Sequence, residues 1–293
     1  MRYIKKAFLL ITTSATLLSC SKSNDEPSSK ARLIFKFKFD PTQIRLNNIG
    51  QPSTIPAGNA GQSPVFNLMS SHYIELAPNA LTQLGAGTVL FHAAETTEGG
   101  ANAIDFSKNK AVGNGEEFFR IPLKDIKPGD YEWLRVSLAY QNYDITIKNK
   151  NPLDPNTTID VSGTVASFLG FNTFIKTFNI KNTSLAVNAN KKQGFWAFEV
   201  LGKNFSGDAA KTTVVNPIST TSPIPAGSCV VTAAFNKKLT ITGNETKDIV
   251  VEVSLSTNKS FEWKEVVADG YFQPDAGETV EDMGVRGMIP TIK

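Results

Sequence analysis

"RLIFKFKFD", at residues 32–40, is the stretch that decides the class of fold. A phenylalanine stands at every second position from Phe35 to Phe39, with Lys36 and Lys38 between them. Alternation with a period of two predicts a β-strand that buries one face and exposes the other. The Asp-Pro pair that follows is a turn signal and ends the strand.

The same alternation recurs along the chain. "YEWLRVSLAY" (131–140) predicts a strand with Leu134, Val136, Leu138 and Tyr140 on one face. Further strands are predicted by "DIVVEVSLS" (248–256), "GFWAFEV" (194–200), "FFRIPL" (118–123), "TVLFHAA" (88–94), "TFIKTFNI" (173–180), "SCVVTAAF" (228–235) and "KLTITG" (238–243). Many short strands separated by turn residues are typical of an all-β fold.

The predicted fold is therefore an antiparallel β-sandwich with little helix, because no twelve-residue window keeps a helical apolar period. It extends over residues 31–293, as one unit or as two packed sandwich-like parts. Two parts would join near 188–194 or 216–227, which are polar or rich in turn residues. Residues 48–70 are expected to be a long connection.

The N-terminus is typical of a secretory signal. "MRYIKK" carries three basic residues and no acid, and an uncharged, mostly apolar run follows from Ala7 to Leu18. That run is too short to span a bilayer, so residues 1–19 are predicted to be a cleaved leader. The polar residues after Cys20, up to residue 30, predict a disordered tether.

"LLSC", at residues 17–20, resembles the lipobox of bacterial lipoproteins. The resemblance implies that the chain is cut before Cys20 and that this cysteine carries several acyl chains, which anchor the protein in a membrane. Ser21 follows the cysteine in place of aspartate, and in lipoprotein sorting this implies the outer rather than the inner membrane. The side of that membrane that the protein faces stays open.

Charge and cysteine content narrow the function. The whole chain has 30 basic and 27 acidic side chains, and the leader would remove three basic ones. The mature protein would be neutral, which argues against a nucleic-acid partner. Cys229 would be its only free thiol, and its apolar neighbours predict a small buried strand residue rather than a nucleophile.

The chain contains two histidines, His72 in "SSHYIEL" and His92 in "VLFHAAE". Each lies on or near a predicted strand, so two strands could bring the rings together as metal ligands. We favour the simpler interpretation of strand histidines that hydrogen-bond to a neighbour, because there is no third histidine and no HxH spacing.

An acidic C-terminal segment is a second candidate metal site. Four of its carboxylates are candidate ligands, and they lie among turn residues: Asp269, Asp275, Glu278 and Glu281. Hard oxygen donors on a loop suit calcium. The spacing does not fit an EF-hand, and a solvated loop is the simpler interpretation. In the nearby tail, Arg286 is expected to pair with Asp282 at the surface.

Aromatic side chains suggest a binding surface. Trp133 lies on the more polar face of its predicted strand with Arg135 two residues on, and Trp263 lies among charged residues. Exposed indole rings stack on sugars, so these three residues are candidate ligand-binding residues. The alternative is that both tryptophans are buried, as tryptophan usually is.

The β-rich body behind a lipobox and tether resembles bacterial surface lipoproteins, some of which bind glycans. The segments "LIFKFKFD", "IKPGDYEWLRVSLAY" and "QGFWAFEV" are also similar to the MbnP-like, methanobactin-associated copper-binding periplasmic domain. That resemblance implies a copper site built from histidines and a tryptophan-derived ligand, for which Trp196 is the matching aromatic.

The sequence thus predicts a lipid-anchored binding protein outside the cytoplasm, with a glycan or a partner protein as its ligand. It is not predicted to be an enzyme, because HExxH, GxSxG, P-loop and CxxC motifs are all absent. Two alternatives stay open: a protein that handles copper or calcium, and a structural or assembly subunit.

Overall fold

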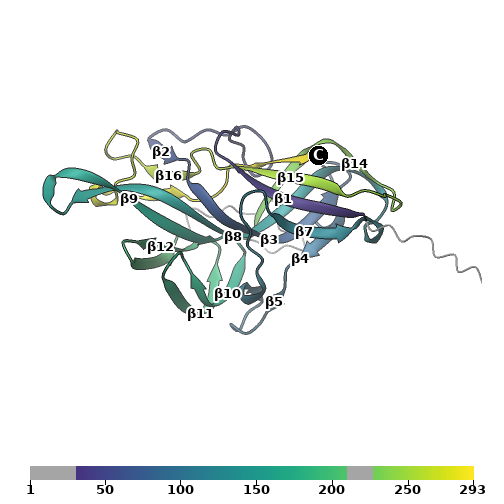
Figure 1. Cartoon of the computed structure of the whole chain (residues 1–293), viewed down its shortest axis with the longest axis horizontal. Coiled ribbons are helices and arrows are strands. Elements are labelled where there is room, and N and C mark those ends of the chain that lie inside the picture. Colours follow the sequence, from purple (N-terminus) through teal and green to yellow (C-terminus); the bar gives the residue numbers. More distant parts are fainter. Residues whose placement is uncertain (1–30, 210–226) are drawn as a thin grey trace, which may run out of the picture.

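The computed structural model describes residues 31–209 and 227–293. The predicted leader, Cys20 and the tether lie outside these residues. Within them, helical residues are confined to three short 3₁₀ turns: η1 (Phe106–Lys108), η2 (Leu123–Asp125) and η5 (Pro274–Ala276). No helix of the described chain is long and apolar enough to cross a bilayer. The fold is all-β and sandwich-like, as predicted (Figure 1).

The first sheet has the order β18-β15-β1-β7. Strand β1 (Arg32–Asp40) buries all three of its phenylalanines, which confirms the alternation in the sequence. It pairs antiparallel with β7 (Glu117–Pro122) but parallel with β15 (Ile249–Ser256), whose other neighbour is β18 (Met288–Ile292). The fold is therefore mostly rather than wholly antiparallel.

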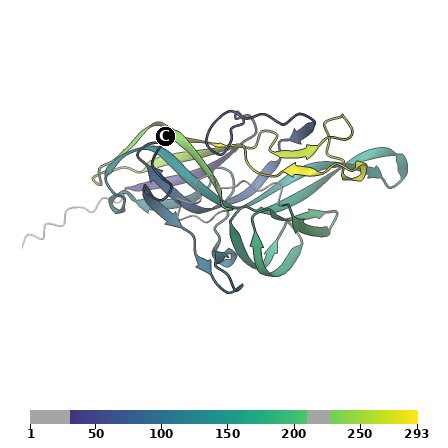
Figure 2. The same ribbon diagram turned by 180° about the vertical axis from the view of Figure 1, so that it is seen from behind.

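A seven-stranded sheet forms the centre of the molecule, with the order β13-β12-β9-β8-β3-β4 and β14 paired to β8. Its strands are β3 (Val65–Ala77), β4 (Thr88–His92), β8 (Gly129–Asn151), β9 (Asp154–Phe168), β12 (Phe195–Val200), β13 (Lys203–Asp208) and β14 (Cys229–Ile241). Figure 2 shows this sheet from behind. Strand β14 joins "SCVVTAAF" and "KLTITG", which the sequence predicts as two strands, across an irregularity between Ala234 and Leu239.

Both faces of this sheet are covered. A third sheet has the order β11-β10-β6-β5, formed by β11 (Ser184–Lys192), β10 (Asn172–Asn179), β6 (Ala103–Asp105) and β5 (Glu95–Thr96). The main core contains residues of the first and central sheets, and a second core joins the central sheet to the third. A small sheet of β17 (Val280–Asp282), β16 (Phe261–Lys264) and β2 (Asn59–Gln62) completes the fold.

Strand β8 corrects the predicted face of Tyr140. Its partners in β3 pass from Ser70 opposite Tyr140 to Ser71 opposite Leu138, so Ala139 is an inserted residue. Such a β-bulge turns the following side chain to the other face. Leu138 therefore lies in the main core and Tyr140 in the second core.

The predicted connections also differ from the structure. Residues 188–194 lie in β11 and in the tight turn to β12, so they continue a pair of strands. Residues 48–70 contain β2 and the start of β3 rather than one long connection. Most of the other predicted junction, 216–226, lies outside the described residues.

Candidate metal centre

Two histidines and a glutamate converge where the central sheet meets the third sheet. The histidine of β3 owes its direction to a second irregularity in that strand. Ser71 lies opposite Leu138 and Tyr73 lies opposite Ser137, which leaves His72 as the inserted residue. A bulge re-aims the side chain that it contains. The side chain of His72 therefore lies on the same face of the sheet as that of Tyr73. Tyr73 pairs with His92 of β4, so the two histidine side chains lie on one face.

The other two residues flank a change of sheet. His92 is the last residue of β4, and Glu95 is the first residue of β5, which pairs with β6 in the third sheet. The two residues between them carry the chain across, and the backbone N–H of Ala93 donates to the carbonyl of His72 at 2.7 Å. The cluster therefore links three strands from two sheets.

The ligand atoms of the three side chains lie close together. One ligand atom from each residue can be chosen so that all lie within 4.8 Å of one another. Nε2 of His72 is 3.0 Å from Oε1 of Glu95, and Nε2 of His92 is 3.5 Å from the same oxygen. The imidazole centroids are 4.7 Å apart. Among residues 31–209 and 227–293, no other group of three such side chains converges in this way.

Burial keeps the first histidine neutral. The side chain of His72 has no exposed surface, and burial lowers its pKa to about 4, although the hydrogen bond to Glu95 acts in the opposite direction. A neutral imidazole is the form that binds a metal. The side chain of His92 is 42% exposed, so an ion would reach the centre from this side.

Hydrogen bonds from neighbouring groups orient the candidate ligands. Nδ1 of His92 lies 3.1 Å from the carbonyl oxygen of Ala93, and a proton on Nδ1 leaves the lone pair of Nε2 facing the cluster. The side-chain amide of Asn102 donates to Oε2 of Glu95 at 2.6 Å, which leaves Oε1 for the two histidines. The ring of Phe171 packs 5.6 Å from that of His72.

The predicted C-terminal acids do not form a comparable centre. Glu278 is buried and accepts backbone N–H groups from Val266, Val267 and Gln273, so its carboxylate holds the loop together. Asp269 pairs with Lys148 at 3.7 Å. Asp275 is exposed in η5, and Glu281 is near Thr279. The four carboxylates do not converge on one another, which argues against the calcium alternative.

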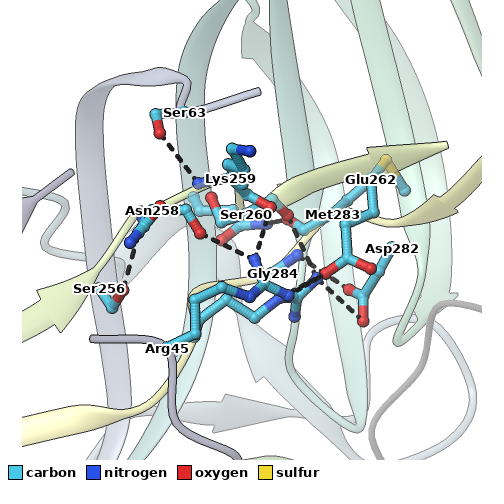
Figure 3. A network of polar contacts seen from close by, with 12 residues as sticks. Arg45, Ser63, Ser256, Asn258, Lys259, Ser260, Glu262, Asp282, Met283 and Gly284 are labelled. Carbon is cyan, nitrogen blue, oxygen red and sulfur yellow. Dashed lines mark hydrogen bonds and ion pairs between the residues drawn. The ribbon is translucent and has the colours of Figure 1, made fainter. Parts of the chain in front are cut away.

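Arg286 does pair with Asp282, at 3.1 Å, but its guanidinium is nearly buried, while Asp282 stays partly exposed. Figure 3 shows the polar network around Arg45, Glu262 and Asp282. Arg45 and Arg286 both contact Oε1 of Glu262, at 2.5 and 2.8 Å, and the two guanidinium groups also donate to carbonyls of residues 258–260. The network fastens β16 to the last segments of the chain.

The candidate sugar-binding residues are mostly buried, which corrects that expectation. Trp263 is 0% exposed and packs against Phe261 and Phe272. Arg135 is 4% exposed and lies 3.6 Å from the buried carboxylate of Glu75. Neither can contact a sugar from this position. Trp133 keeps a partly exposed ring, but the predicted partner beside it is turned inward.

The two other predicted residues of interest lie apart from the cluster. Cys229 is a buried residue at the start of β14, as predicted, and burial raises the pKa of its thiol to about 12. Trp196, the aromatic implied by the copper-domain resemblance, lies on β12. Strands β9 and β8 separate it from β3, so it is not a ligand candidate here.

Glu95 was not among the residues predicted from the sequence. Its signal is the spacing "HAAE" at residues 92–95, in which a carboxylate follows a histidine by three positions. Comparisons with protein-family models, curated proteins and solved structures found no match to this chain. The fold and this cluster therefore define the chain only as an all-β protein with a candidate metal centre.

Proposed function

We propose that this protein is a lipid-anchored metal-binding protein of the cell envelope, which holds one divalent transition-metal ion at His72, His92 and Glu95. The observation that carries the proposal is the convergence of three ligand atoms within 4.8 Å. If each histidine only formed a hydrogen bond to a neighbour, there would be no reason for the two imidazoles and a carboxylate to lie together. Catalysis by a cysteine nucleophile is not part of the proposal, because the one described thiol is buried and its pKa is raised.

The donor set favours zinc or copper(II) over calcium. Imidazole nitrogen suits zinc and copper, whereas calcium takes six to eight oxygen ligands. Two imidazoles and one carboxylate leave at least one coordination position for water, because zinc sites are commonly four-coordinate. The exposed edge of His92 gives that position access to solvent.

Equilibrium dialysis of the purified protein against Zn²⁺, Cu²⁺ and Ca²⁺, with the bound metal measured by mass spectrometry, tests the metal proposal. We expect about one Zn²⁺ or Cu²⁺ per chain and no Ca²⁺ at the same free concentration. Glu95→Gln and His92→Ala should each weaken metal binding by at least ~10–100-fold. That is the typical cost of removing a residue that only hydrogen-bonds to a metal ligand, and these two residues are candidate ligands themselves.

Glu98→Gln is the matched control for Glu95→Gln, because Glu98 lies three residues further on in an exposed pair with Lys176. It should bind metal like the wild type. A protein that takes up neither ion, or a Glu95→Gln variant with wild-type affinity, would refute the metal centre.

The membrane anchor is tested separately. If Cys20 is acylated, cells fed a labelled fatty acid should label the wild-type protein, and Cys20→Ser should lose the label and its membrane attachment. Several acyl chains together give a stable anchor, since each buried methylene contributes ~0.8 kcal/mol. Labelled Cys20→Ser protein, or an unlabelled wild type with an intact leader, would disprove this part of the proposal.

A further inference from the structure

A cavity of about 480 Å³ lies where strands of three sheets meet. It is bounded by β7 of the first sheet, by the end of β4 in the central sheet, and by the β6–η1 segment of the third. Its volume falls in the range of small-molecule sites, ~300–1,000 Å³. The residues that flank the metal ligands, Ser71, Ala93 and Ala94, line it, but the three ligands themselves do not.

Aromatic side chains form the apolar part of the cavity wall. The rings of Phe91 and Phe119 lie 5.2 Å apart, one from β4 and one from β7, and Phe118 and Ile104 also line the wall. Phe91 and Phe119 are each only partly buried. An apolar group placed here would remove further aromatic surface from water, which favours binding by ~25 cal/mol per Å².

The acidic groups of the cavity are already engaged. Oδ1 of Asp105 accepts the backbone N–H of Ser107 at 3.0 Å and its hydroxyl at 2.6 Å. Glu117 pairs with Arg120, the only arginine in the wall. Both carboxylates therefore have local partners.

Two lysines of the cavity wall, unlike these carboxylates, have no described partner for their charged groups. Lys108, at the end of η1, and Lys110, two residues further on, form no ion pair with any residue of 31–209 or 227–293. The cavity thus combines an aromatic wall with two ammonium groups that form no described ion pair. An apolar body with an anionic group is complementary to both features.

We propose that this cavity binds a small organic carboxylate, with its apolar body against Phe91 and Phe119 and its carboxylate toward Lys108 and Lys110. The site is distinct from the metal centre and does not depend on it. The two sites share β3 and β4, with the metal ligands on one side and the cavity on the other.

Titration calorimetry with paired probes tests the proposal on the full chain. Naphthalene-2-carboxylate and octanoate supply the charge, and the corresponding carboxamides are neutral analogues of nearly the same shape. We expect at least one acid to bind with a Kd below about 1 mM and about tenfold more tightly than its amide, since two partly exposed ion pairs are lost with the charge.

Variants then assign the binding to the cavity. Lys108→Gln/Lys110→Gln should bind acid and amide equally, whereas the matched Lys124→Gln/Lys127→Gln protein, whose exposed lysines lie outside the cavity wall, should keep the preference. Phe119→Ala should weaken both probes. Zinc uptake should be unchanged in the lysine variants, which separates this proposal from that of the metal centre.

Three results would overturn the assignment. One is the absence of saturable binding by either acid at about 1 mM. The second is an acid that binds no better than its amide. The third is an undiminished preference for the acid in Lys108→Gln/Lys110→Gln.

Discussion

Replacing Glu262 with glutamine is expected to lower the free energy of unfolding by about 3–5 kcal/mol. One oxygen of this carboxylate contacts Arg45 (Figure 3) and also Arg286. All three side chains are nearly buried, with exposed fractions of 6% for Glu262, 11% for Arg45 and 10% for Arg286. Glutamine keeps the shape but removes the charge. Arg286 would then keep only Asp282, which is itself 30% exposed, and Arg45 would keep no carboxylate partner among the described residues.

Chemical denaturation of the wild type and of Glu262→Gln measures this loss. Glu252→Gln is the matched control, because Glu252 pairs with Lys293 at 2.9 Å on the surface, where the two side chains are 31 and 50% exposed. That pair should contribute at most about 1 kcal/mol. Equal effects of the two substitutions would show that the buried network does not carry the stability assigned to it.

Acid should destabilise the metal-free protein through His72. Burial lowers the pKa of this residue from 6.5 to about 4 in the folded state, so between these pH values the unfolded chain binds a proton that the folded chain does not. The free energy of unfolding therefore falls as the pH drops from 6.5 towards 4. At 1.36 kcal/mol per pKa unit, His72 accounts for a loss of about 3 kcal/mol, and for no further loss below pH 4.

Denaturation of the chelator-treated protein at several pH values between 7 and 4.5 tests this prediction. His72→Gln should show a smaller slope of stability against pH over this interval, whatever its stability at pH 7. His92→Gln is the control, and it should retain most of the wild-type slope, because burial rather than the neighbouring His92 is the main cause of the lowered pKa of His72. An unchanged slope in His72→Gln would mean that the buried imidazole does not control acid stability.

Local pattern was enough to predict most strands. In β1 every second side chain enters the core, and Cys229 is buried at the start of β14, because the direction of a side chain in a regular strand follows from its position alone. His92 also lies on a strand that the sequence predicts, whereas β3, which carries His72, begins inside the predicted connection. What the pattern could not supply is the set of neighbours that each strand meets.

Those neighbours decide which residues are accessible. Trp263 and Arg135 lie next to charged or polar residues in the sequence, yet a second sheet or loop covers each of them. Strand β8 is buried on both faces because the central sheet packs against two others. Charged neighbours in the sequence do not reveal whether another sheet or loop will bury a residue.

The sequence by itself determined an all-β chain, the strand that opens its folded body, the buried thiol and the strand that carries His92. These features depend on alternation within a few consecutive residues. Only the tertiary structure decided that His72 occupies a bulge, that Tyr140 changes face, and that Glu95 joins the two imidazoles. The reason is that the register between strands is set by pairing across the sheet, and a shift of one residue in that pairing turns a side chain to the opposite face.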